Sequence, residues 1–129
     1  MFDLTFDHYT IRVKDLDRSA DFYKNVLGFT EIKNRTEKPH IRWFSMGEGR
    51  ELHIARGNSD MIKTHVGVHM ALRLTKFDDF LSHLKKYNIN QHNSKGISDC
   101  ITTRADGIRQ VYFQDPDGYW IEVNEAEIL

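Results

Sequence analysis

The chain has little of several features that mark particular protein classes. It contains one cysteine and two prolines in 129 residues. The single Cys100 cannot form an internal disulfide, which is typical of proteins in a reducing cytosol. No apolar stretch approaches the roughly 20 residues of a membrane span, and the first residues lack the basic and apolar segments of a secretory signal. We therefore expect a cytoplasmic protein with no membrane partner.

An excess of charge of one sign is also missing. The 18 basic and 19 acidic residues give a formal net charge of −1, without a long run of either sign. A nucleic-acid partner is therefore not expected. The sequence also lacks a phosphate-binding glycine-rich loop, a Gly-x-Ser-x-Gly nucleophile elbow and a Cys-x-x-Cys pair. Histidine, by contrast, is abundant at seven residues, which directs attention to metal or proton-transfer chemistry.

The sequence repeats a strand followed by a helix. His8-x-x-Ile-Arg-Val resembles His69-x-x-Leu-Arg-Leu at an offset of 61 residues. Apolar residues at helical spacing follow each segment and predict helices over about 15–28 and 75–88. Asp15 or Asp17 is the expected N-cap of the first helix, and Thr75 that of the second. Gly28 and Asn88 are expected just beyond the two C-terminal ends, where a positive φ closes a helix.

The strands that follow each helix repeat as well. Residues 40–49 match residues 109–118 at an offset of 69, with aromatic pairs and turn glycines in the same places. At that offset Leu52–Ile54 lies over Ile121–Val123. Repeats decide architecture, and each half reads β-α-β-β-β.

The repeat predicts an α+β fold of two paired βαβββ modules. One domain spans residues 1–129, with module one at about 1–60 and module two at about 64–129. The extra residues of the second copy are expected within 90–103.

Four polar residues occupy two equivalent positions in the two copies. His8 and His69 lie on the first strands, and His53 and Glu122 on the last strands, all opposite the face that packs on the helices. If the sheets curl around a hollow, these side chains point into it. Imidazole and carboxylate donors suit one divalent transition metal such as Zn²⁺, Ni²⁺, Co²⁺, Mn²⁺ or Fe²⁺. Each residue taken alone is as readily explained by an ordinary strand position, so the symmetry of the set carries the prediction.

Other polar residues share the same parity. Glu51, two residues before His53, is its rival as fourth ligand, and is otherwise a candidate base, a group supporting a ligand, or a solvated carboxylate. Glu122 is a second candidate catalytic carboxylate. Arg12 and Arg73 are candidates for holding an anionic substrate, although surface or inter-copy ion pairs explain them equally well. Trp120 is a candidate wall of the pocket.

Motifs at the two ends of the chain resemble one superfamily. They are Asp7-His8, Arg12-Val13-x-Asp15-Leu16, Phe22-Tyr23, Leu27-Gly28-Phe29 and Asp115-Pro116-Asp117-Gly118-Tyr119-x-Ile121-Glu122. The chain is similar over nearly its whole length to the vicinal oxygen chelate superfamily, also called the glyoxalase, bleomycin-resistance and extradiol-dioxygenase superfamily. The resemblance implies a glyoxalase-like fold, in which the paired modules form a curved mixed sheet around a common cup. It also implies metal ligands on the first and last strands of each module. Carried onto this sequence, those ligands are His8, His53 or Glu51, His69 and Glu122.

The resemblance also implies a range of activities. It favours a metal-dependent lyase or isomerase of glyoxalase type, acting on a small substrate through vicinal oxygens and an enolate-like intermediate, as lactoylglutathione lyase does. Glyoxalase I often has Glu at the position where His53 falls, and this departure weighs against lactoylglutathione lyase activity. One alternative is an extradiol ring-cleaving dioxygenase. Another is a non-catalytic drug-binding resistance protein, in which Trp43, Trp120 and Tyr112 stack on the ligand. Exposed sheet edges predict a homodimer.

Overall fold

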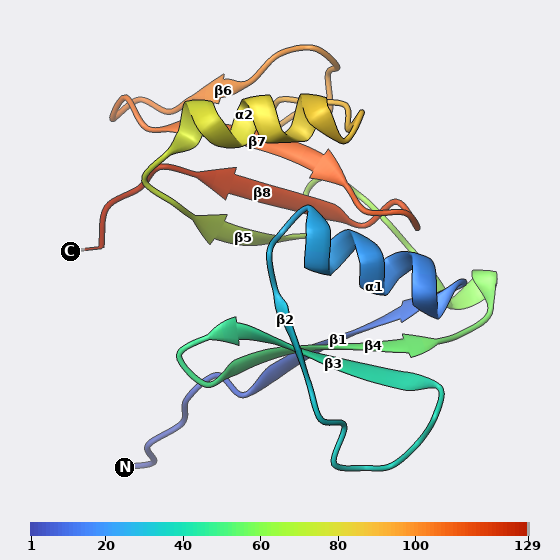
Figure 1. The fold of residues 1–129 in the computed structure, drawn as a ribbon. Helices are drawn as coiled ribbons and strands as arrows, with labels where there is room; N and C mark the ends of the chain where they lie inside the picture. The colour runs from blue at the N-terminus through green and yellow to red at the C-terminus, as the bar shows by residue number, and fades with distance from the viewer. Residues whose placement is uncertain (129) are drawn as a thin grey trace. The chain divides into compact units, whose positions relative to one another are not determined.

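The computed structural model describes residues 1–128. The chain divides into two compact units, the first covering Met1–Ile62 and the second beginning at Lys63. Each unit holds one α-helix and one four-stranded mixed sheet (Figure 1). The α+β fold of two βαβββ modules is therefore confirmed. The common cup between the modules stays a prediction.

The first unit contains a three-stranded antiparallel meander, and the first strand of the unit pairs in parallel with the last strand of that meander. Its elements are β1 (His8–Val13), α1 (Leu16–Asn25), β2 (Thr30–Ile32), β3 (Ile41–Gly47), β4 (Arg50–Arg56) and the 3-10 helix η1 (Ser59–Met61). The sheet order is β1-β4-β3-β2. β1 pairs with β4 in parallel, and the other pairs are antiparallel. The parallel pair requires a long connection, which α1 and the β2–β3 hairpin supply.

The second unit repeats this topology. Its elements are β5 (His69–Arg73), α2 (Phe77–Lys86), β6 (Thr102–Thr103), β7 (Arg109–Gln114) and β8 (Trp120–Asn124). The sheet order is β5-β8-β7-β6, and β5 pairs with β8 in parallel. The extra residues follow α2. The His92 backbone forms an isolated bridge with Tyr112, and residues 93–101 then form a loop before β6. The insertion therefore lies within the predicted interval.

The registers of the two sheets are equivalent. Thr10 on β1 is the Cα partner of His53 on β4. Adding the two sequence offsets, 61 and 69, gives Ala71 and Glu122, which are partners in the second sheet. His53 and Glu122 therefore occupy the same place in the two modules, as the alignment predicted. The equivalence rests on hydrogen-bonded pairing and not on sequence likeness alone.

The helices are shorter than predicted at both ends. Asp15 is the N-cap of α1, and its side chain accepts a hydrogen bond from the Arg18 amide, as predicted. Thr75 as the second N-cap is wrong, because α2 begins after Lys76, whose φ and ψ lie outside the usual cap region. Gly28 and Asn88 both have positive φ and lie just past the two helix ends, where that conformation turns the chain away.

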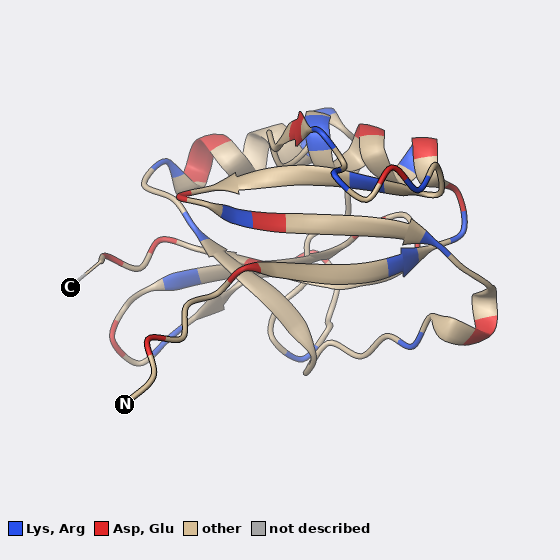
Figure 2. Cartoon of the chain, turned by 90° about the horizontal axis from the view of Figure 1, so that it is seen from below, with Lys and Arg blue, Asp and Glu red and all other residues tan. Residues whose placement is uncertain are grey.

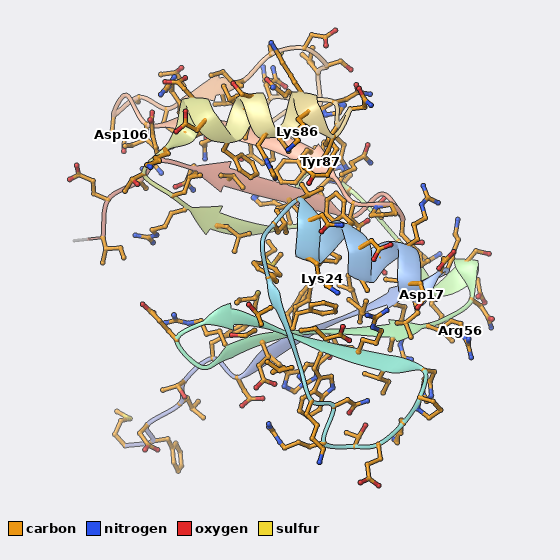
Figure 3. The ribbon with its side chains drawn as sticks, in the orientation of Figure 1. Asp17, Lys24, Arg56, Lys86, Tyr87 and Asp106 are labelled. Atoms are coloured by element: carbon orange, nitrogen blue, oxygen red, sulfur yellow. The ribbon has the colours of Figure 1, made fainter. Side chains whose placement is uncertain are left out.

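Charges at the helix ends follow the macrodipole. Asp17 lies in the first turn of α1 and Lys24 in its last turn (Figure 3). Carboxylates near the N-terminus and ammonium groups near the C-terminus stabilise a helix. α2 has the same polarity, with Lys86 in its last turn beside the ring of Tyr87 (Figure 3).

One face of each sheet packs against its own module's core. The buried apolar residues of these faces alternate along the strands. They are Ile11, Val13, Phe44, Leu52 and Ile54 in the first unit, and Val111, Phe113, Ile121 and Val123 in the second. The opposite face of each sheet carries the polar residues predicted to form the site. Register is thus fixed by the core, because a slip of one residue would bury the wrong set.

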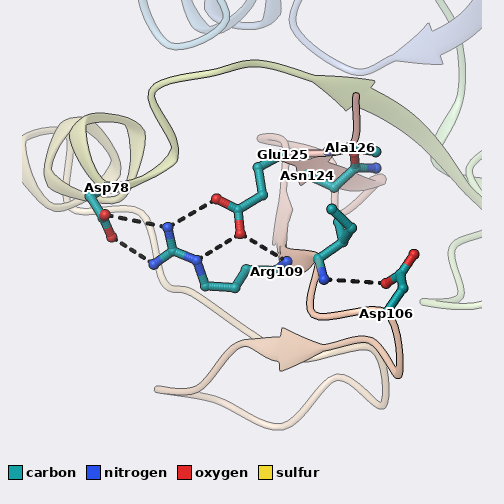
Figure 4. A network of polar contacts seen from close by, with 7 residues as sticks. Asp78, Asp106, Arg109, Asn124, Glu125 and Ala126 are labelled. Atoms are coloured by element: carbon teal, nitrogen blue, oxygen red, sulfur yellow. Dashed lines mark hydrogen bonds and ion pairs between the residues drawn. The ribbon is translucent and has the colours of Figure 1, made fainter. Parts of the chain in front are cut away.

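Two arginines at the edges of the cores tie each helix to its sheet. Arg109 on β7 donates to both carboxylate oxygens of Asp78 on α2 and to Glu125 (Figure 4). Its guanidinium also covers the Phe77 ring. These hydrogen bonds raise the pKa of Arg109 and lower that of Glu125. In the first unit Arg42 contacts Glu31 and Asp17 in the same manner. These arginines serve the fold and leave the site face to other residues.

Acidic and basic residues are interspersed along the elements of each unit (Figure 2). That distribution agrees with the near-zero net charge. Among residues 1–128, neither α-helix has the length and apolar character needed to cross a bilayer.

Candidate metal centre

Glu122 lies on β8, on the site face of the second sheet, with its side chain only 7% exposed. Three donors surround it, which we call the carboxylate clamp: Gln110, Tyr112 and Asn124. The Tyr112 hydroxyl donates to Oε1 at 2.8 Å. The Gln110 and Asn124 amide groups donate to Oε2 at 2.9 and 2.7 Å. The buried carboxylate between Ile121 and Val123 therefore accepts hydrogen bonds at both of its oxygens.

The clamp sets the protonation of its own members. Burial acts to raise the pKa of Glu122, but hydrogen bonds from Asn124, Tyr112 and Gln110 outweigh it, and the pKa lies below its usual value. Burial and the bond to Glu122 raise the pKa of Tyr112 to about 12. At neutral pH the site therefore holds a charged carboxylate and a neutral phenol.

His69, on the neighbouring strand β5, faces two acceptors. Its Nδ1 lies 2.7 Å from the Val66 carbonyl oxygen, which can only accept, so Nδ1 carries a hydrogen. Its Nε2 lies 3.1 Å from Glu122 Oε1. A neutral imidazole has one N–H, and that hydrogen is already used at Nδ1. The Nε2 lone pair and a carboxylate oxygen therefore face each other, a contact that requires either a second proton or a cation.

The corresponding pair in the first unit is arranged differently. His8 and His53 stack with ring centroids 4.1 Å apart. His8 Nδ1 lies 2.6 Å from Asp7 Oδ2, which fixes the hydrogen on Nδ1 and leaves Nε2 available. His53 Nε2 lies 2.9 Å from Glu51 Oε1. The rivals for the fourth ligand thus contact one another, and an Nε2–H donated to Glu51 leaves Nδ1 of His53 as the available nitrogen.

Trp43 and Arg35 extend this stack. The Trp43 indole lies parallel to the His53 ring at 4.0 Å, and the Arg35 guanidinium covers the indole at 4.8 Å. Arg35, Trp43, His53 and His8 form what we call the aromatic column. It holds the His53 ring in one plane, with a side chain that is 9% exposed.

The three predicted substrate-binding residues share the site face of their own sheets but are spread along it. Arg12 is exposed, and its stem lies beside Gly57. Arg73 is exposed and donates to the Glu127 carbonyl at 3.2 Å. Trp120 is the Cα partner of His69, and the edge of the His92 ring meets it at 4.9 Å. Trp120 is thus beside the candidate ligands, whereas the two arginines lie farther along β1 and β5.

Sequence reasoning did not find the carboxylate clamp as a unit. Gln110 and Asn124 were passed over, and Tyr112 was considered only for ring stacking. A usable signal was present, because Tyr112 is the antiparallel partner of Glu122 and Gln110 is that of Asn124. Pairing the predicted strands residue by residue would have placed three hydrogen-bond donors around one carboxylate.

Comparison with known proteins decides the family. Residues 5–123 match the model of the Glyoxalase/Bleomycin resistance protein/Dioxygenase superfamily. The chain belongs to this superfamily. The superfamily resemblance seen in the sequence is therefore confirmed.

Individual relatives span most of the chain. The uncharacterized protein YwbC of Bacillus subtilis is 33% identical over 122 residues, which is 90% of this chain and 93% of YwbC. The lactoylglutathione lyase of Pseudomonas aeruginosa is 24% identical, covering 98% of this chain and 85% of that enzyme. A crystal structure of a point mutant of the fosfomycin resistance protein FosX from Listeria monocytogenes aligns with a TM-score of 0.78 at 21% identity, covering 99% and 95% of the two chains. That FosX structure contains Mn(II) and 1S,2S-dihydroxypropylphosphonic acid.

A divalent metal fits the donors of this superfamily member. Two metal–ligand bonds of about 2.1 Å span about 3.0 Å at an octahedral angle and about 3.4 Å at a tetrahedral one. The separation of His69 Nε2 and Glu122 Oε1, 3.1 Å, lies between these values. His8 and His69 each have Nδ1 held by an oxygen, an arrangement that orients Nε2 toward a metal. Among the described residues, 1–128, no three or more His, Cys, Asp or Glu side chains gather into one group able to hold a metal ion.

Proposed function

We propose that this protein is a divalent-metal-dependent enzyme, a lyase or isomerase that acts on a small substrate carrying two neighbouring oxygens. The observation that carries the proposal is the contact between His69 Nε2 and Glu122 Oε1. Membership of the superfamily supports it, since the FosX relative was crystallised with Mn(II). Zn²⁺, Ni²⁺, Co²⁺, Mn²⁺ and Fe²⁺ all suit these donors.

The proposed ligand set is His8, His53, His69 and Glu122, with the first-unit donors supplied by the same chain or by a second copy. Asp7 and Glu51 support His8 and His53, as carboxylates support ligating histidines in other metal sites. We further propose a homodimer that acts in the cytoplasm.

The bound metal would supply Lewis-acid polarisation of the substrate's two oxygens. Glu51 is the proposed base, because its carboxylate is 17% exposed and contacts His53 rather than a clamp of donors. Its carboxylate receives the proton from the carbon beside the substrate carbonyl. The hydrogen bond between His53 Nε2 and Glu51 Oε1 holds the carboxylate in place. Glu122 is a weaker base, because three hydrogen bonds lower its pKa.

The surroundings of the ligands would orient the substrate. The proposed anion contacts are Arg12 and Arg73, and Trp120 forms a wall beside His69. Stacking of a drug on Trp43 or on Tyr112 is disfavoured. Trp43 is covered by His53 and Arg35, and the Tyr112 hydroxyl is bound to Glu122.

A second candidate is ring cleavage by an extradiol-type dioxygenase. His8, His69 and Glu122 form a two-histidine, one-carboxylate set, which is typical of Fe²⁺ oxygenases. The anchored Nδ1 atoms of both histidines favour it. Aerobic catechol assays on the Fe²⁺-loaded protein separate this candidate from the first.

The test is an assay of metal-reloaded protein with a glutathione hemithioacetal, and with catechols in parallel. We expect turnover of one of these substrate classes, which a chelator abolishes and metal restores. At saturating metal, Glu51→Gln should lose turnover by about 100-fold or more, the usual range for a general base. Its loss of metal affinity should stay within about 10- to 100-fold, the range for a group that supports a ligand, whereas Glu122→Gln should lose the metal. Turnover that is indifferent to chelation, or Glu51→Gln with wild-type turnover, would contradict the assignment.

A further inference from the structure

The two modules treat equivalent positions in opposite ways. At the offset of 69 residues, Gln110, Tyr112 and Asn124 correspond to Ile41, Trp43 and Ala55. The cross-strand pairings agree, because Tyr112 opposes Glu122 just as Trp43 opposes His53. At these three positions the second module therefore has polar donors that bind its carboxylate, and the first has an indole and two aliphatic side chains.

The donors divide the two oxygens of Glu122 between them. Oε2 receives both amide groups, from Gln110 at 2.9 Å and Asn124 at 2.7 Å. Oε1 receives the Tyr112 hydroxyl and faces His69 Nε2. A carboxylate in this arrangement cannot rotate about its last bond without breaking two amide hydrogen bonds. Oε1 is therefore held toward His69 and Oε2 is held away from it.

We propose that Gln110 and Asn124 are positioning residues that make Glu122 a one-oxygen metal donor. The inference rests on the proposed metal site and adds which residues fix its geometry. The two amides occupy the lone pairs of Oε2, so only Oε1 remains to meet a metal beside His69. Without them the carboxylate is free to rotate and to present both oxygens.

The role is distinct from support of the fold. Gln110 and Asn124 lie on the sheet face opposite the buried apolar residues Val111, Phe113 and Val123. Asn124 also accepts a hydrogen bond from the Ala126 amide at 3.0 Å, so its replacement disturbs the chain end as well. Gln110 is the cleaner position to change, because it is only half-buried and its amide points at Glu122.

The experiment compares Gln110→Met with Gln114→Met as the matched control. Gln114 lies on the same strand and face, and its amide donates to the Gly118 carbonyl instead of to Glu122. Calorimetric titration with Mn²⁺ and with Co²⁺ measures affinity, and the Co²⁺ visible spectrum reports the coordination number and geometry of the bound ion. Asn124→Ala is the second variant, and thermal unfolding of each metal-free protein measures the effect on the fold.

We expect Gln110→Met and Asn124→Ala to weaken metal binding about 10- to 100-fold, the range found when groups supporting metal ligands are removed. Their Co²⁺ spectra should shift, and Gln114→Met should match the wild type in both readouts. Wild-type affinity and an unchanged spectrum in both variants would overturn the positioning role while leaving the metal site intact. A wild-type protein that binds neither of these ions, nor Zn²⁺, Ni²⁺ or Fe²⁺, would overturn the proposed function together with this inference.

Discussion

Tyr112→Phe removes one hydroxyl from the carboxylate clamp and little else. The ring stays, so its edge contact with His69 is kept and no cavity of ring size opens. The deleted hydrogen bond is 2.8 Å long, is buried, and has a charged acceptor. Hydrogen bonds to charged groups contribute about 1.5–3 kcal/mol. We therefore expect the free energy of unfolding of the metal-free protein to fall by about 2 kcal/mol at pH 7.

The assay is urea unfolding followed by circular dichroism at a fixed protein concentration. The exposed Tyr9→Phe is the control and should change stability by less than about 0.5 kcal/mol. The clamp lowers the pKa of Glu122 in the folded state. Its stabilisation is therefore fully present above the unfolded value of about 4.3 and is lost as pH falls through the lower folded value. The difference between wild type and Tyr112→Phe should shrink over that acidic range.

A double-mutant cycle decides whether the effect acts through Glu122. In a Glu122→Ala background the hydroxyl has lost its acceptor, so Tyr112→Phe should cost less than about 0.5 kcal/mol. A cost of about 2 kcal/mol in both backgrounds would refute the reasoning, as would a cost near zero in the wild type.

Three further outcomes follow from the structure. Spectrophotometric titration should find one tyrosine with a pKa of about 12, and this tyrosine should be absent in Tyr112→Phe. Because folding raises the pKa of the Tyr112 hydroxyl, its contribution to stability is lost as pH rises above the unfolded value of about 10. Asp15→Ala removes the side-chain cap of α1 and should destabilise the protein by about 1 kcal/mol, with circular dichroism unfolding as the check and an unchanged midpoint as the contrary result. Sedimentation at micromolar concentration should give the mass of two chains, and a mass of one chain would exclude the proposed homodimer.

Much of the fold was predictable because the same strand and helix patterns occur in both halves of the sequence. The offsets of 61 and 69 residues placed His53 and Glu122 in equivalent positions before any pairing was known, and the registers agree. The helix starts were less predictable. Asp15 caps α1, but Thr75 stands one residue too early for α2, because local capping preference does not fix where the packed face of a helix begins.

The partners of the candidate ligands were harder to predict. Strand parity places Gln110, Tyr112 and Asn124 on the face of Glu122, but parity gives neither side-chain rotamers nor which oxygen each donor meets. The same limit applies to the aromatic column. Parity places Trp43 on the face of His53, but it does not predict that the two rings stack. The arrangement of donors around one carboxylate depends on cross-strand geometry, which a single strand's pattern does not contain.

The central claim is that His69 and Glu122 bind a divalent metal. The most direct measurement is the metal content per chain, by plasma mass spectrometry, after loading with each of Zn²⁺, Ni²⁺, Co²⁺, Mn²⁺ and Fe²⁺ and exhaustive dialysis. The wild type should retain about one ion per chain with at least one of these metals, and His69→Ala and Glu122→Gln should each retain a small fraction of it while unfolding cooperatively. A wild type that retains none of the five metals, or variants that retain as much as the wild type, would contradict the claim.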